Sequence, residues 1–229
     1  MRTKLSVIVG AVLCAVWIGG CQGHNAAAVS QNTRTATDIR KAELQRELDK
    51  KWENPAALFE LGQLYHAEGN WSKAEWYYNN ALGFDPVMYN AKASIVKLQL
   101  DKGDKSRAKW AADNYIAQAA SSPDQLLDLG AAFDKQEGLD DYALRCYQDA
   151  LKMAPDAPKV NRQLGYYYLA KNKKDLAKEY FTRSFQLNPN QPDVAGELGR
   201  LGVVIKVPQA PEPPPENLGQ ATKPASQPK

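Results

Sequence analysis

Cysteine and histidine are the residue types best suited to nucleophilic or metal chemistry, and this chain has few of them. They are Cys14, Cys21, Cys146, His24 and His66, and they are spread along the sequence without the spacing of a metal site or a disulfide framework. The sequence also has no phosphate-binding glycine loop and no nucleophile-elbow motif around a serine. We therefore expect no enzyme activity, no metal and no cofactor. For Cys146, the interpretation of a packed, inert thiol stands beside the alternative of a reactive one.

Cys21 has a different chemistry because of its position. Two basic residues and an apolar run over residues 5–18 precede it, and this run is too short to span a bilayer. The sequence Ile-Gly-Gly-Cys at residues 18–21 resembles the lipobox of bacterial lipoproteins. That resemblance implies a signal peptide over residues 1–20 and a lipidated Cys21, which would carry long-chain acyl groups such as palmitate. Gln22 follows, and in such families the lack of aspartate there implies the outer membrane. The alternative is an ordinary signal peptide.

The composition limits the remaining classes of function. The chain has 229 residues, of which 44% are hydrophobic and 24% charged, so it can bury a core. Its formal net charge of +3 is small, and the basic residues are scattered. We therefore expect no nucleic-acid partner, because such binding requires a concentrated basic surface.

The middle of the sequence repeats. A pair of residues, mostly Leu-Gly, begins at positions 61, 95, 129, 164 and 198, and an alanine recurs at 74, 108, 143 and 177. The steps are 34 or 35 residues. Four residues after each alanine stands an aromatic or small side chain, and prolines at 86, 155 and 189 close three of the units. The additional residue of the longer step is expected in the turn at residues 136–141.

This pattern resembles the tetratricopeptide repeat, a hairpin of helices A and B. The resemblance covers about residues 55–191 and implies an all-α superhelix, or α-solenoid, of about four helical hairpins with a C-terminal capping helix. In such hairpins the glycine of helix A lets helix B approach, and the aromatic fills the gap. Unit two departs from the pattern, with Val96 for the glycine, Gln99 for the aromatic of helix A and Ala120 for the closing proline.

The flanks complete the expected organisation. Asn54 and Pro55 predict a helix start, with Asn as N-cap and Pro in the first turn. Residues 208–229 contain seven of the 14 prolines and are expected to form a polyproline-like tail without a core. The apolar run at 203–207 is expected to lie against the last helix, or alternatively to pair with a partner as a strand. The predicted parts are a signal peptide at 1–20, a flexible tether at 21–36, a helix at 37–53, the repeat domain with its capping helix at 55–207 and the tail at 208–229.

The resemblance also places candidate partner-binding residues on the concave face formed by the A helices. These positions mix aromatic, amide and singly charged side chains, which suit a protein or extended peptide better than a small anion; the alternative is a solvated groove without a ligand. They lack the lysine and asparagine set of the family's chaperone-tail receptors. The positions are Phe59, Gln63, His66, Asn90, Ala93, Lys97, Leu127, Ala131, Asp134, Arg162, Tyr166 and Leu169.

Tryptophans suggest a second surface. Trp76 and Trp110 are 34 residues apart, and each lies two residues after the packed alanine of its helix B. That offset turns them about 200° from the alanine, so we expect a stacked pair on the outer face, facing a partner or lipid headgroups. The alternative is that both pack on neighbouring helices.

Together these features predict a membrane-anchored scaffold for protein–protein interaction in the cell envelope. The plan of lipobox and repeats is similar to that of lipoproteins that assist pilus assembly and secretin insertion, and to others that recruit envelope hydrolases. The alternative is a structural tether that connects the outer membrane with the cell wall through the proline-rich tail. An enzyme that uses Cys146 or His66 is a third, disfavoured interpretation.

Overall fold

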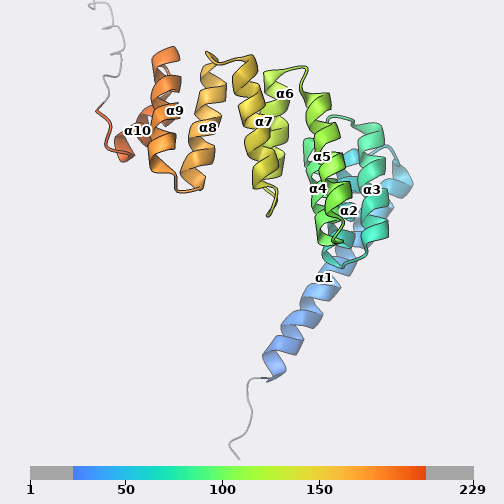
Figure 1. Ribbon diagram of the computed structural model, residues 1–229. Coiled ribbons are helices and arrows are strands. Elements are labelled where there is room, and N and C mark those ends of the chain that lie inside the picture. The colour runs from blue at the N-terminus through green and yellow to red at the C-terminus, as the bar shows by residue number, and fades with distance from the viewer. Residues whose placement is uncertain (1–22, 205–229) are drawn as a thin grey trace, which may run out of the picture.

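The computed structural model describes the backbone of residues 23–204 and the side chains of residues 36–204. Within these residues the chain is entirely helical (Figure 1). The predicted signal peptide, the predicted lipidation site at Cys21 and the predicted tail at 208–229 lie outside them. The helices are α1 Gly23–Lys50, α2 Pro55–Ala67, α3 Trp71–Phe84, α4 Tyr89–Asp101, α5 Lys105–Ala119, α6 Pro123–Asp134, α7 Asp140–Met153, α8 Pro158–Ala170, α9 Lys174–Leu187 and α10 Pro192–Arg200.

The helices form the predicted solenoid of hairpins. The pairs α2/α3, α4/α5, α6/α7 and α8/α9 are the four hairpins, and α10 packs on α9 at the end of the stack (Figure 1). The predicted capping helix is thus confirmed, and α2 begins at Pro55 as the sequence indicates. The Asn54 side chain caps it by accepting a hydrogen bond from the Ala57 amide at 3.2 Å.

The turn inside each hairpin requires a left-handed backbone conformation. Gly69, Gly103 and Gly138 occupy this position with φ of 73°, 81° and 83°, and Asn172 takes it in the last hairpin with φ of 57°. Glycine adopts this region freely and asparagine tolerates it better than most residues. The additional residue of unit three lies in the turn between α6 and α7, as expected.

Glycines and aromatics set the spacing of three hairpins. A Cβ added at Gly62 would lie 2.5 Å from the Tyr78 ring, and the equivalent distance at Gly165 is 2.4 Å from Phe181. Gly130 and Tyr147 repeat this contact. The predicted role of the glycine is confirmed, because any side chain there would force helices A and B apart.

In the α4/α5 hairpin the larger of the two facing side chains is on helix A instead of helix B. Val96 occupies the glycine position of α4, and Ala112 occupies the aromatic position of α5. Both side chains are fully buried. The larger side chain has moved from helix B to helix A, which explains how unit two keeps the fold without the glycine.

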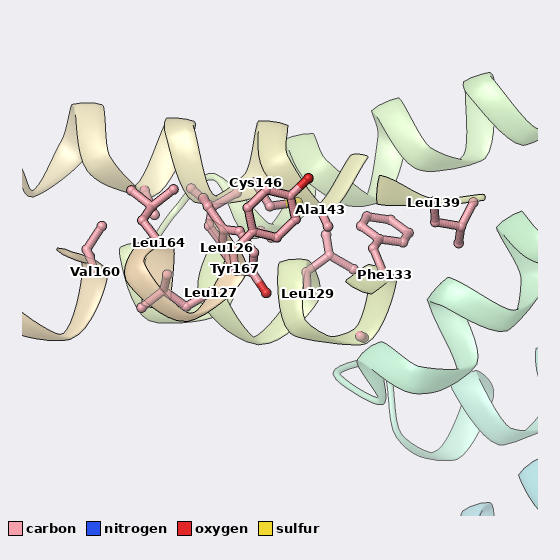
Figure 2. Packing of buried hydrophobic residues seen from close by; sticks show 14 of the residues in the cluster. Leu126, Leu127, Leu129, Phe133, Leu139, Ala143, Cys146, Val160, Leu164 and Tyr167 are labelled. Carbon is pink, nitrogen blue, oxygen red and sulfur yellow. The ribbon is translucent and has the colours of Figure 1, made fainter. Parts of the chain in front are cut away.

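The core runs the length of the stack. One buried cluster extends from α4 to α10, and Figure 2 shows its centre, where residues of α6, α7 and α8 meet. A second cluster joins α1 to the first hairpin through Leu44 and Leu48. Arg40 fixes the same contact with two hydrogen bonds to the Glu60 carboxylate, at 2.6 and 2.8 Å.

The start of α1 corrects one prediction. Residues 21–36 were expected to be a flexible tether, but α1 begins at Gly23 and continues without interruption to Lys50. The prediction relied on the absence of an apolar period. Three consecutive alanines at 26–28 favour helix, however, and extending a helix from its folded end is much easier than starting one.

Candidate interaction surface

The A helices α2, α4, α6 and α8 carry the residues predicted to line a groove. Gln63 of α2 and Asn90 of α4 are exposed, whereas Phe59, Ala131 and Leu169 are half-buried. Ala93 and Leu127 are buried at 0% and 4% exposure, so their assignment to a binding face is wrong. Figure 2 shows Leu127 within the α6–α8 packing. The reason is that α6 packs directly on α4, which covers side chains that a wider groove would leave open.

The charged positions of this row contact other side chains of the stack, either on a neighbouring helix or, for Lys97, on the same helix. His66 of α2 reaches across to α4, where its Nε2 lies 3.0 Å from a carboxylate oxygen of Asp101, and its Nδ1 lies 3.2 Å from the Tyr78 hydroxyl. Lys97 Nζ donates a hydrogen bond to the other Asp101 oxygen at 2.6 Å. Asp134 of α6 forms an ion pair at 3.1 Å with Lys171, which follows α8. These side chains therefore stabilise the row itself, in addition to any partner contact.

Arg162 and Tyr166 of α8 share one partner on the capping helix. The Tyr166 hydroxyl donates a hydrogen bond to Asp193 at 3.1 Å, and an Arg162 nitrogen lies 3.5 Å from the same carboxylate oxygen. Burial and the contact with Asp193 raise the pKa of the Tyr166 hydroxyl. Asp193 was not predicted, because only the three-dimensional placement of α10 shows that a side chain 27 residues later meets Tyr166.

The two outer-face tryptophans are exposed, Trp76 by 51% and Trp110 by 70%. They do not form the predicted stack. The ring of Trp76 instead lies 5.7 Å from that of Trp52 and 4.8 Å, edge on, from that of Tyr77. The reason is that α5 packs on α4 and α6, so that α3 and α5 are not direct neighbours.

Beside Trp76 is a cleft of about 390 Å³ between α1, α2 and the first turns of α3. Tyr65 and Tyr77 stack in it with their ring centroids 5.4 Å apart and their planes 5° from parallel. The Lys73 ammonium lies 4.9 Å from the centre of the Tyr65 ring. Gln45 of α1 and Ser72 of α3 complete the lining. The sequence shows these residue types, but α1 had to be placed before the cleft could be recognised.

Cys146 is a packed residue. Its side chain is fully buried in α7, and burial raises the pKa of its thiol to about 12. Figure 2 shows it among the buried residues of the cluster. The thiol is therefore protonated near neutral pH, which agrees with the predicted inert role.

None of the helices within the described residues is long and apolar enough to cross a membrane. A model of the tetratricopeptide repeat matches residues 160–191, so the chain contains this repeat in its fourth hairpin.

Two sequence relatives align over 148 residues, which are 63% of this chain. A type IV pilus assembly protein, PilF of Pseudomonas aeruginosa, is 29% identical, and the alignment covers 58% of its length. The human protein O-mannosyl-transferase TMTC1 is 26% identical over only 17% of its length. The chain thus spans less than two thirds of either relative. The chain is also similar to the solved structure of Pseudomonas aeruginosa PilF, with 27% sequence identity and a TM-score of 0.35. This structural alignment covers 64% of the present chain and 67% of the PilF chain.

Proposed function

We propose that this protein is a non-enzymatic scaffold, held by a lipid at Cys21 on the periplasmic side of the outer membrane, that binds a protein or an extended peptide in pilus or secretion-system assembly. The observation that carries the proposal is the sequence identity of 29% over 148 residues with a pilus assembly protein. A row of A helices with exposed amides at Gln63 and Asn90 supports it, because solenoids of this type bind partners along such rows.

The long first helix adds a geometric consequence. α1 has 28 residues and begins two residues after the proposed lipid site, and at 1.5 Å per residue it spans about 42 Å. A helix of this length would separate the repeats from the anchored residue by a defined distance. In this arrangement the hairpins meet a partner some way above the membrane surface.

Lipid attachment and assembly are tested together by replacing Cys21. Wild-type cells grown with labelled palmitate should yield a labelled protein, and Cys21→Ser should lose the label and fail to restore pilus or secretin assembly in a deletion strain. Cys14→Ser is the matched control, since Cys14 would be removed with the signal peptide. A fully labelled Cys21→Ser variant, or normal assembly without any label, would contradict the proposal.

The tether between outer membrane and cell wall remains the second candidate, and the seven prolines at 208–229 favour it. Deleting residues 208–229 separates the two functions. A scaffold would keep its partner and lose no assembly, whereas a tether would no longer sediment with purified peptidoglycan.

A further inference from the structure

The aromatic cleft beside Trp76 has features that its repeat counterpart lacks. Tyr168 and Tyr180 of the last hairpin stack in the same way, with centroids 5.4 Å apart, so the stacked tyrosines belong to the hairpin design. Glu179 stands in α9 where Trp76 stands in α3. Trp110 of α5 also carries an indole at this position. Among the described hairpins, however, only the first adds a second indole beside it, at Trp52, and a wall supplied by α1. The stacked tyrosines are therefore structural, whereas the second indole and the α1 wall are additions found at the first hairpin.

The chemistry of the lining favours a proline-rich peptide. Aromatic-lined grooves bind polyproline II segments, because the proline rings pack on the aromatic faces and the extended conformation is already formed. Such a segment has free carbonyl oxygens, and Gln45, Ser72 and the Trp76 indole carry hydrogen-bond donors beside the rings. The exposed Lys73 adds a positive charge at the rim.

One segment of this chain matches that chemistry. Residues 211–216 read Pro-Glu-Pro-Pro-Pro-Glu, so three consecutive prolines are bounded by two carboxylates that complement Lys73. We propose that the cleft formed by Gln45, Tyr65, Ser72, Lys73, Trp76 and Tyr77 binds residues 211–216 of a second copy of the protein.

The short length of chain between Val204 and the proline segment favours binding to a second copy over binding to the cleft of the same chain. The helices that form the cleft, α1, α2 and α3, lie at one end of the stack, and α10, which Val204 follows as the last described residue, lies at the other (Figure 1). The row from α2 to α10 takes four steps of about 8 to 10 Å each, on the order of 35 Å in all. Pro213 is nine residues after Val204, and nine residues of polyproline II span only about 28 Å. A tail that enters the cleft of a neighbour produces a head-to-tail contact, which leaves one cleft and one tail free for further copies.

Sedimentation of the chain from residue 22 onward tests the proposal. We expect reversible association that increases with concentration, weakened about tenfold or more by Trp76→Ala, as for a central aromatic of an interface. Trp110→Ala is the matched control, because Trp110 is also exposed and occupies the same repeat position but lies outside the cleft, so this variant should associate normally. Replacing the three prolines at 213–215 by serine should abolish association without touching any described residue.

Mixing two deficient variants gives the sharpest test. The Trp76→Ala chain keeps its tail, and a chain that ends at residue 207 keeps its cleft, so neither should associate alone but together they should form a one-to-one complex. Equal association of the Trp76→Ala and Trp110→Ala chains would overturn the proposal, as would association of the chain without its tail. A chain that stays monomeric but binds vesicles of anionic and zwitterionic lipid through Trp76 would assign the cleft to the membrane and refute it as well.

Discussion

The exchanged sizes in the α4/α5 hairpin predict a strong coupling between two substitutions. Val96→Gly removes a fully buried isopropyl group, which costs about 2 kcal/mol of burial, and glycine inside a helix costs about 1 kcal/mol more. Ala112→Phe alone adds a ring where there is no space and costs about 1 to 3 kcal/mol. Combined, the two substitutions recreate the pair formed by Gly165 and Phe181.

We expect the double variant to be destabilised by no more than about 2 kcal/mol, so that the substitutions rescue each other by about 2 kcal/mol or more. Urea unfolding followed by far-UV circular dichroism measures the free energies. Val96→Gly combined with Leu198→Ala, in the distant α10, is the control and should give additive losses. If the losses in free energy of unfolding were additive for Val96→Gly and Ala112→Phe as well, the claim that the larger side chain has moved from helix B to helix A would be refuted.

Three further predictions concern other parts of the stack. Gly165→Ala should lower the free energy of unfolding by about 1 to 3 kcal/mol, because its Cβ would meet the Phe181 ring; Gly196→Ala, where nothing lies nearby, should raise it by about 0.5 to 1 kcal/mol in urea titrations. Burial raises the pKa of the Cys146 thiol in the folded protein, so folding is penalised once the unfolded chain can ionise this thiol, as pH rises above about 8.5. The free energy of unfolding should therefore fall between pH 7 and pH 10, and Cys146→Ala should make this fall smaller. Asp193→Asn should speed amide hydrogen exchange in α10, since it removes the carboxylate that holds α8 to the cap, whereas unchanged exchange would mean that this contact contributes nothing to docking.

The shared contact at Asp193 also affects any binding test on this face. Replacing Arg162 and Tyr166 together by alanine would be the obvious test of partner binding at this face. Both side chains contact the capping helix, so this pair also loosens α10. Asp193→Asn separates the effects: it disturbs the cap in the same way but leaves the two candidate binding side chains in place.

The repeat spacing was enough to predict the helical hairpins, the capping helix and the role of the glycines. These follow from local rules, since the Leu-Gly and Ala positions recur at fixed intervals and each glycine meets the aromatic of its own hairpin. Asn54 and Pro55 located the start of α2 because capping depends on neighbouring residues.

The packing of one unit against the next could not be predicted from the repeat spacing. Ala93 and Leu127 are buried because α4 and α6 pack directly on each other. Trp76 meets Trp52 because the connection between α1 and α2 passes beside α3. Both arrangements depend on contacts between separate units, which a repeat pattern does not specify. The start of α1 was missed for another reason: helix extension needs no apolar face.

Photo-crosslinking in cells tests the central claim most directly, that the A-helix row binds another polypeptide. A photoreactive residue is placed at Gln63 on α2 or, as the matched control, at the exposed Gln148 on α7, a B helix. We expect a discrete adduct with one envelope protein from Gln63 and none from Gln148. Adducts from Gln148 alone, or the same adducts from both positions, would contradict the claim.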